Sequence, residues 1–453
     1  MDLHIRNFGA IENADVKFDG LTVIAGENDT GKSTVGKLVF AVIKAISRYE
    51  QDLEVGKDRN VKRLVEKLYL KIRRSIHLND LYRQEFNPKN FIHELSFFIK
   101  GQPSLFQDFV FDSEQLDKLF QHKQNLIEDI GIVADLYDTD NLLSSLNDIR
   151  VELEKTETKS DVLKKALKRA FVAEFYGNFS TKNHQTKSII NFTEEKDLLF
   201  EIQAEKNNIK DFIIHEEIPP YEDVTFIETP ILVQMFDAIN HSKSIFELNT
   251  GERTRLPVRP NVSLHIKDLM DKIANSSDLV EVDLLNEKQK EIIDNIAKIV
   301  QGNWVFDRKK RDFIFSKKEK NKKTSQFRSI NTASGIKSFG IIQLLLLSEV
   351  LNNRSLLIID EPETHLHPKW QVEYAKIICL LVKHEIPVLV TSHSPYLIQG
   401  LRHYSKEYGI EKFTNYYLAE RNDNGLVEIE HVNDDLNRVF LKLSQPLHDL
   451  VWK

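Results

Sequence analysis

The hydrophobic pattern near the start of the chain changes twice. Residues 2–25 alternate apolar and polar in short runs and then become continuously apolar over 21–25, which predicts two exposed strands followed by a buried one. From Ser33 onward the apolar residues recur three and four positions apart, as they do on one face of a helix. The sequence therefore predicts a strand, a glycine-rich turn and a helix in that order.

A second ordered pattern occupies the final third of the chain. An apolar helical segment at 341–352 precedes a continuously apolar run at 356–359, and a second helical segment at 371–383 precedes the apolar run at 387–390. Helices that alternate with continuously apolar strands are typical of a parallel sheet covered on both faces. We therefore expect an α/β fold with a mainly parallel sheet and an antiparallel layer of strands at the start of the chain.

The region between these two patterns is mostly helical and charged up to about residue 180, with helix again at 262–300. Heptads do not persist, so helical hairpins are expected there rather than one long coiled coil. We expect a discontinuous head and a mainly helical insertion that carries additional strands around 188–230 and 304–316. The expected bounds are 1–50 and 325–453 for the head and 51–324 for the insertion.

The glycine-rich turn carries the first chemical motif. Its sequence from Gly26 to Ser33 reads G-x-x-x-x-G-K-S, a complete phosphate loop. The glycines let backbone N–H groups turn toward phosphate oxygens, and the following helix adds its positive N-terminal end. Lys32 would bridge the outer phosphates of ATP, and Ser33 would coordinate Mg²⁺. The candidate nucleotide-binding residues are Gly26, Asn28, Asp29, Thr30, Gly31, Lys32, Ser33 and Thr34.

Two further motifs follow the buried strands of the final third. Asp360 and Glu361 come directly after 356–359, and carboxylates at the carboxyl edge of a parallel sheet face the ligand crevice. Asp360 would hold Mg²⁺ and Glu361 would polarise the attacking water, whereas the alternative is a simple acidic turn before a proline. His393 follows the next strand and should lie beside Asp360, where it could bind the γ-phosphate or the water. A purely structural histidine is the alternative, and the candidate catalytic residues are Glu361, His393 and Lys32.

A fourth motif, Ser334-Gly335 with Lys337 close behind, opens the apolar helix about 25 residues before the acidic pair. Small residues at a helix N-terminus can form an anion site, although a plain helix cap is the alternative interpretation. His365 and His367 lie near the acidic pair and could be read either as metal ligands or as residues that shape the loop.

The order of these motifs resembles that of the ABC ATPases of the SMC/RecF/OLD group, over about 1–45 and 328–400. The resemblance implies heads that dimerise head to tail around two ATP molecules. Ser334, Gly335 and Lys337 of one subunit would then cap the γ-phosphate held by the other. Ala333 stands where the family signature carries its leading serine, so either Ser334 substitutes for it or hydrolysis is weak. Gln234 is a candidate for the glutamine that senses Mg²⁺ in that family.

Departures from the family pattern exclude several of its branches. The single cysteine, Cys379, rules out a zinc hook, and the adjacent pair Asp434-Asp435 lacks the spacing of an OLD-type nuclease. A transporter subunit would lack the long helical insertion. No apolar run approaches the ~20 residues of a membrane helix, and the first residues do not resemble a signal segment. A cytoplasmic protein without a membrane partner is therefore expected.

Charge leaves the choice of partner open. The net charge is −7, yet 308–328 holds ten lysines and arginines against Asp312 and Glu319. This basic stretch is either a solvated hairpin or a contact for DNA phosphates. We expect an ATP-gated homodimer, or a higher homo-oligomer, that acts in a DNA-structure-sensing complex or in a Septu-type defence module with a separate effector nuclease or toxin. A nucleotide-dependent scaffold without turnover is the third alternative.

Overall fold

The computed structural model describes residues 1–75, 80–100, 113–134, 139–154, 159–179, 187–215, 221–241, 243–244, 261–276, 286–318 and 324–452. The chain forms two compact units, and each is described by itself below. The larger unit consists of 1–47 together with 163–453, and the smaller unit is 48–162.

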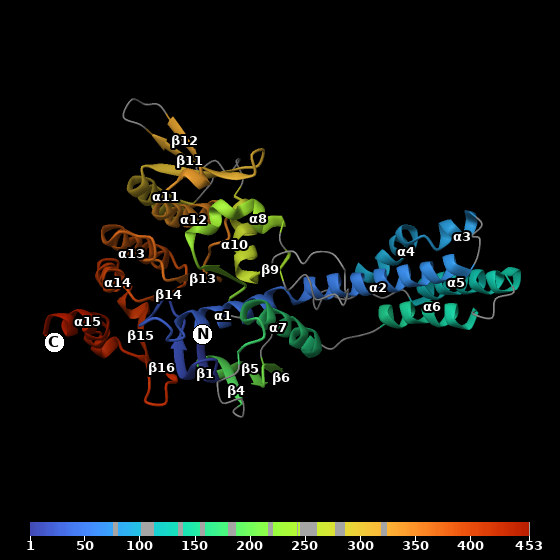
Figure 1. Ribbon diagram of the computed structural model, residues 1–453, viewed down its shortest axis with the longest axis horizontal. Helices are drawn as coiled ribbons and strands as arrows, with labels where there is room; N and C mark the ends of the chain where they lie inside the picture. Colours follow the sequence, from blue (N-terminus) through green and yellow to red (C-terminus); the bar gives the residue numbers. More distant parts are fainter. Residues whose placement is uncertain are drawn as a thin grey trace. The chain divides into compact units, whose positions relative to one another are not determined.

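The larger unit is built on a mixed sheet of eleven described strands, in the order β6-β5-β4-β1-β2-β16-β15-β3-β14-β13-β7 (Figure 1). The five strands from β15 to β7 run parallel to one another, whereas β16 is antiparallel to β15. The strands of this sheet are β1 (Asp2–Phe8), β2 (Ile11–Lys17), β3 (Leu21–Gly26), β4 (Ser188–Glu194), β5 (Asp197–Glu205), β6 (Asn208–Ile214), β7 (Asp223–Ile227), β13 (Ser355–Asp360), β14 (Val388–Ser392), β15 (Thr414–Arg421) and β16 (Val427–His431).

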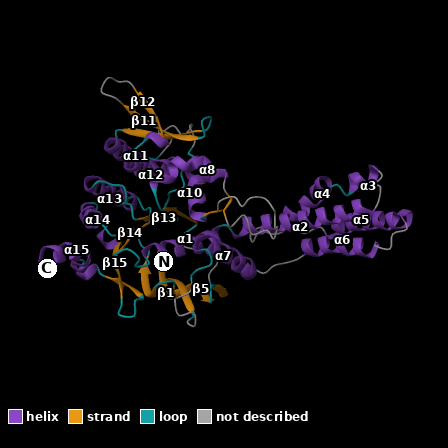
Figure 2. Cartoon of the chain, viewed as in Figure 1, coloured by secondary structure: helices purple, strands orange, loops and turns teal. Residues whose placement is uncertain are grey.

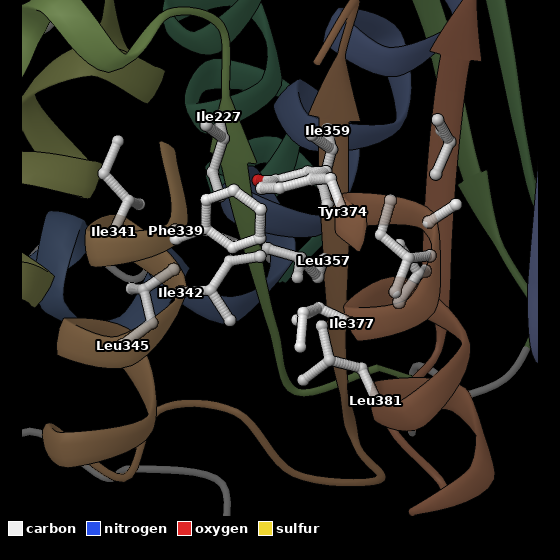
Figure 3. Close-up of a cluster of buried hydrophobic side chains, with 14 of the residues drawn as sticks. Ile227, Phe339, Ile341, Ile342, Leu345, Leu357, Ile359, Tyr374, Ile377 and Leu381 are labelled. Atoms are coloured by element: carbon white, nitrogen blue, oxygen red, sulfur yellow. The ribbon is translucent and has the colours of Figure 1, made fainter. Parts of the chain in front are cut away.

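Helices cover both faces of the parallel part of the sheet, as the continuously apolar strands predict. On one face, Leu357 and Ile359 of β13 point toward Phe339 of α12 and Ile377 of α13 (Figure 3). On the other face, α1 lies so close that a Cβ on Gly36 would meet Phe226 at 3.0 Å and Ile358 at 3.1 Å. Glycine at position 36 therefore allows the helix that follows the phosphate loop to pack directly on β7 and β13.

The helices and short turns of the larger unit connect these strands and supply its core. They are α1 (Lys32–Ser47), α7 (Lys159–Phe175), η1 (Pro230–Met235), α8 (Phe236–His241), α10 (Leu264–Ala274), α11 (Glu287–Val300), η3 (Ser329–Asn331), α12 (Ser334–Leu347), α13 (Pro368–Lys383), α14 (Pro395–Glu407), η4 (Glu411–Phe413), η5 (Asn433–Asp435) and α15 (Asn437–Trp452). Of α7, the part before residue 163 is counted with the smaller unit.

The antiparallel layer at the start of the chain is confirmed: β1 pairs with β2, and β4 pairs with β1 on its other side. The strands expected around 188–230 are also present, but they join the main sheet rather than a separate insertion, because β7 pairs in parallel with β13 and β4 pairs with β1. The structure therefore differs from the expected insertion of 51–324, and the compact unit apart from the head is 48–162. The hydrophobic pattern locates strands but does not tell which strands pair.

Two strands near the end of the chain, β15 and β16, complete the sheet and were not anticipated from the sequence. β15 lies parallel to β3 on the side away from β14, and β16 connects it to β2. β15 thereby forms one wall of the phosphate loop, since a Cβ on Gly26 would come within 2.5 Å of the Ala419 carbonyl oxygen.

A separate antiparallel sheet of three strands, β10 (Gly302–Asp307), β11 (Asp312–Lys318) and β12 (Thr324–Arg328), contains the expected hairpin. Trp304, Phe313 and Phe315 are buried in the core of the larger unit. The turn at 308–311 is exposed, so the basic side chains of the hairpin are separated from its aromatic ones. Part of the basic stretch, 319–323, lies outside the described residues. The short strands β8 (Lys243–Ser244) and β9 (Asn261–Val262) pair in parallel.

The described part of the smaller unit is entirely helical (Figure 2). Buried apolar side chains, among them Phe86, Phe91 and Ile127, form its core. Within this core Lys123 is fully buried, and its ammonium is bound by Glu85 at 2.7 Å and Glu94 at 3.0 Å. Its helices are α2 (Tyr49–Ser75), α3 (Asp80–Glu85), α4 (Pro88–Lys100), α5 (Ser113–Ala134) and α6 (Thr139–Glu154). No helix in the described parts of the chain is both long and apolar enough to cross a bilayer.

Candidate functional site

The phosphate loop connects β3 to α1, as the sequence predicts. Asp29 and Gly31 have left-handed backbone conformations, with φ of 62° and 72°. The Thr30 hydroxyl donates to the Glu27 carbonyl at 2.8 Å and holds the turn closed. Arg421, at the end of β15, donates from its guanidinium to both the backbone and the side chain of Asp29 at 2.5 Å. The loop is therefore held from inside and from the neighbouring strand before any ligand binds.

Lys32 begins α1 and is almost fully buried, with 3% of its surface exposed. Its ammonium donates to the carbonyl oxygens of Gly26 at 3.0 Å and Glu27 at 2.6 Å, and lies 3.6 Å from Glu361 Oε1. A buried ammonium that faces into its own loop can exchange these carbonyls for phosphate oxygens. Ser33 and Thr34 follow it on the first turn of α1.

Asp360 ends β13 and is buried beside the first turn of α1. Its carboxylate accepts hydrogen bonds from Ser33 and from the Thr391 hydroxyl, the latter at 2.5 Å. Burial raises the pKa of Asp360, and these two hydrogen bonds oppose the shift. A serine hydroxyl and a carboxylate side by side are the hard oxygen ligands that Mg²⁺ takes together with nucleotide phosphates, so this donor set fits a magnesium nucleotide.

Glu361 and His393 lie next to each other at the carboxyl ends of β13 and β14. The distance from His393 Nδ1 to Glu361 Oε1 is 3.5 Å. Interaction with His393, and then with Lys32, lowers the pKa of Glu361, while Glu361 raises the pKa of His393. Glu361 has φ of 44°, an unusual conformation for a non-glycine residue, and its N–H donates to the Thr391 carbonyl at 3.1 Å. The structure thus presents an ionised carboxylate at the opening of the phosphate loop.

These contacts bring Lys32, Ser33, Asp360, Glu361 and His393 to one edge of one sheet. The strand register explains why, because Asp360 is the partner of Thr391 and Ser392 is the partner of Ala25. The ends of β13, β14 and β3 therefore meet side by side. Such an edge, with a buried lysine, two carboxylates and a histidine, can bind a triphosphate and activate a water beside it.

The residues expected to act on a partner subunit lie at a different place. Ser334 and Gly335 open α12, and a Cβ on Gly335 would come within 2.9 Å of the Trp370 ring. Lys337 is buried, and its ammonium donates to Gln234 at 2.5 Å. Within the described residues, no hydrogen bond or ion pair joins Ser334, Gly335 or Lys337 to the side chains at the sheet edge. Gln234, exposed on η1, contacts this group and not the phosphate loop.

Next to the edge lies a chain of charged contacts that no sequence motif predicts. Lys37, one turn after Ser33, contacts Glu228 at 3.0 Å, and Glu228 lies 3.2 Å from His265. The other ring nitrogen of His265 lies 2.6 Å from Glu174 of α7. Burial lowers the pKa of His265, but the two carboxylates outweigh it and raise the pKa to about 9. His265 in turn lowers the pKa of Glu228 to about 2. An imidazolium thus ties α10 to α7 and to the end of β7.

His365 and His367 shape the turn that leads into α13. His367 caps α13, where its Nδ1 accepts from the Lys369 N–H at 3.2 Å, and His365 has φ of 74° in the preceding turn. Among the residues that the structure describes, no group of three or more His, Cys, Asp or Glu is arranged to hold a metal ion.

The fold and the edge together define an ATP-binding ATPase of the phosphate-loop class. The chain belongs to the family described as the AAA ATPase domain, whose model matches residues 1–398. That match covers both the phosphate loop and the motifs that end β13 and β14. The ATPase class that the order of the motifs predicts is confirmed by this match.

Individual known proteins are similar either over a short segment or at low sequence identity. The Septu protein PtuA from Bacillus thuringiensis is 43% identical over 55 residues, which is 12% of this chain and 13% of that protein, so the match spans about an eighth of the relative. The SMC head domain from Thermotoga maritima is 9% identical with a TM-score of 0.38, covering 95% of this chain and 98% of that one. The SMC head bound to the C-winged helix domain of ScpA is 10% identical with a TM-score of 0.42, covering 96% and 98%.

Proposed function

We propose that this chain binds ATP with Mg²⁺ at the edge formed by β3, β13 and β14 and hydrolyses it there. The observation that carries the proposal is the run of contacts from Lys32 through Glu361 to His393, at 3.6 and 3.5 Å, beside the pair of Ser33 and Asp360. Groups that lie far apart in sequence converge on one edge of the sheet with the charges that a triphosphate and its metal require.

Each group at the edge has a role that follows from its chemistry. The backbone of the phosphate loop and Lys32 would hold the outer phosphates, and Ser33 and Asp360 would hold Mg²⁺, whose charge offsets that of the phosphates. Glu361, kept ionised by its neighbours, would orient the attacking water and accept its proton. His393 would donate a hydrogen bond to the γ-phosphate or to that water.

We further propose that ATP joins two copies of the chain head to tail. The start of α12 supports this proposal, because Ala333 at its N-cap makes no side-chain cap and the small residues Ser334 and Gly335 open the helix. Helix N–H groups without a cap are ready to bind an anion such as a γ-phosphate. Lys337 would have to exchange its bond to Gln234 before it could contribute. Hydrolysis would remove the shared phosphate and let the copies separate.

The direct test of the site compares ATP turnover in the wild type with turnover in Lys32→Ala. We expect ATP turnover to fall by about a hundredfold or more, because one preorganised charge at a reacting phosphoryl group contributes about that much. Lys17→Ala is the matched control, because Lys17 is exposed and pairs only with Asp19 among the described contacts. Equal turnover in the wild type and Lys32→Ala would exclude ATP hydrolysis at this site.

The downstream role we favour is the release or activation of a separate effector protein, a nuclease or toxin, in antiviral defence. The matched segment of Septu protein PtuA supports it. The test is co-purification from the native host with and without ATP. We expect a stable partner whose binding changes with nucleotide, and purification of the chain alone in both states would contradict this role.

DNA sensing is a second candidate, supported by the exposed basic turn. Lys309 and Lys310 are exposed there, although Lys310 is paired with Asp307 at 3.1 Å. If this turn and the neighbouring Lys317 and Lys318 contact DNA, neutralising these four lysines should reduce the salt slope of binding by about one for each lost contact. An unchanged slope would remove the hairpin from consideration.

A further inference from the structure

Hydrogen bonds join the end of β13 and the segment after it to the end of β14 and the segment after it. Thr391 donates to Asp360, and the Glu361 N–H donates to the Thr391 carbonyl. Farther along, the Ser394 hydroxyl donates to Gln371 at 2.5 Å, and the Gln371 amide donates to the Leu366 carbonyl at 3.0 Å. His393 lies between Thr391 and Ser394, so its position depends on the side chain that contacts this segment between those two residues.

That side chain is Glu363. It is buried, with 7% of its surface exposed, and its Oε1 accepts from the Ser392 hydroxyl at 2.8 Å and from the backbone N–H of His393 at 2.6 Å. The same oxygen lies 3.3 Å from His393 Nδ1. One carboxylate oxygen therefore contacts both the backbone and the ring of the histidine.

We propose that Glu363 is a positioning residue that fixes the backbone and ring orientation of His393 for ATP hydrolysis. The inference rests on the proposed function, because it assigns Glu363 a role only through His393. Nδ1 lies 3.5 and 3.3 Å from the carboxylates of Glu361 and Glu363 and, within the described residues, makes no hydrogen bond. The negative charge of the two carboxylates favours a proton on that nitrogen. Nε2 is then left as the nitrogen for the nucleotide or the water.

The second oxygen of Glu363 indicates which feature of the side chain positions His393. Within the described residues, Oε2 is buried and has no hydrogen-bond partner. Burial also raises the pKa of this carboxyl. A buried charge without a partner would be costly, so the useful feature is one well-placed acceptor. Glutamine offers the same acceptor at the same distance, whereas aspartate and alanine do not.

The test is a double-mutant cycle with Glu363→Ala and His393→Ala, read as kcat and KM for ATP. We expect Glu363→Ala to lower kcat by about tenfold to a hundredfold, the range of a misplaced proton-transfer group, with KM within about threefold of wild type. The double variant should be no more than about twofold slower than His393→Ala, because both changes remove the same contribution. Glu363→Gln should restore kcat to within about fivefold of wild type.

Two further variants separate positioning from general loosening of the loops. Gln371→Ala breaks the neighbouring hydrogen bonds without touching His393 and should lower kcat by no more than about threefold. Glu363→Asp, which keeps the charge but withdraws the acceptor, replaces Glu363→Ala in the cycle if the alanine variant does not fold, and should be defective in the same way.

Additive losses in the double variant would overturn the inference, as would normal turnover in both Glu363→Ala and Glu363→Asp. The same holds for a defect in Glu363→Gln equal to that of Glu363→Ala. If Lys32→Ala abolishes turnover while the cycle is additive, the proposed ATPase stands and only the role of Glu363 fails. If Lys32→Ala leaves turnover unchanged, the proposed function itself fails.

Discussion

The residues expected to bind ATP lie at two places in the larger unit, the sheet edge and the start of α12. The two places differ in how many of their polar groups already have partners in the same chain. At the sheet edge, Lys32 and Asp360 each contact other polar groups of the same chain at hydrogen-bond distance. At the start of α12, Ala333 supplies no side-chain cap, and Gly335 is covered by the apolar side chains of Trp370 and Leu366. The polar groups of one chain alone hold the sheet edge in place, and we call this edge the organised half. The start of α12, whose N–H groups receive no side-chain cap, is called the open half. This difference is what a site shared between two copies would require.

The largest expected effect comes from breaking the organised half. Asp360→Asn removes a negative charge that would hold Mg²⁺ while it keeps the shape of the side chain. We expect ATP turnover to fall by about a hundredfold to a thousandfold and the Mg²⁺ concentration for half-maximal rate to rise. Magnesium titrations of the turnover rate measure both, with Asp423→Asn in the exposed β15–β16 turn as the control. A variant with normal magnesium dependence would remove Asp360 from the metal site.

A second test concerns the charged contacts behind the organised half. The folded-state pKa of His265, about 9, lies above its unfolded value near 6.5, so its contribution to stability is fully present below pH 6.5 and is lost as pH rises through 9. The difference of about 2.5 units corresponds to on the order of 3 kcal/mol. Denaturant unfolding between pH 6 and 10 should therefore show a loss of stability in the wild type that His265→Gln lacks. Parallel curves for the two proteins would contradict an imidazolium in this position.

The smallest expected effect concerns the open half. Gly335→Ala places a Cβ within 2.9 Å of the Trp370 ring, and overpacking of this kind costs about 1–3 kcal/mol. We expect a lower melting temperature and a weaker ATP-dependent association, while ATP binding to the single chain stays unchanged. Thermal unfolding and nucleotide titration measure these effects, with Ser338→Ala on the same helix as the control. Weaker ATP binding by the monomer would mean that α12 contributes to the site of its own chain.

The residues of the organised half could be predicted because each one ends a strand or begins a helix that the hydrophobic pattern locates. Once β3, β13 and β14 are taken as neighbours, Lys32, Asp360 and His393 must meet at one edge, and the register of the strands places them there. Parallel sheets fix this outcome strongly, because the carboxyl ends of all their strands lie together.

Other parts depend on pairing that no local pattern encodes. β7 joins β13 across more than a hundred residues, and this pairing moves 163–324 out of the expected insertion. His265 contacts Glu174 and Glu228, which are 91 and 37 residues away, so its buried charge has no signal in the sequence. Glu363 stands inside a motif that the sequence does display, but its role follows only from the side on which His393 lies.

The central claim is that Glu361 completes an ATP-hydrolysing site that is shared between two copies. The most direct measurement is light scattering of Glu361→Gln with and without ATP and Mg²⁺, together with its turnover rate. The change keeps the size of the side chain and removes the group that would accept the proton of water. The account predicts that turnover falls about a hundredfold or more and that the variant is a stable dimer only when ATP is present. A variant that stays monomeric with ATP bound, or that hydrolyses ATP as fast as the wild type, would contradict it.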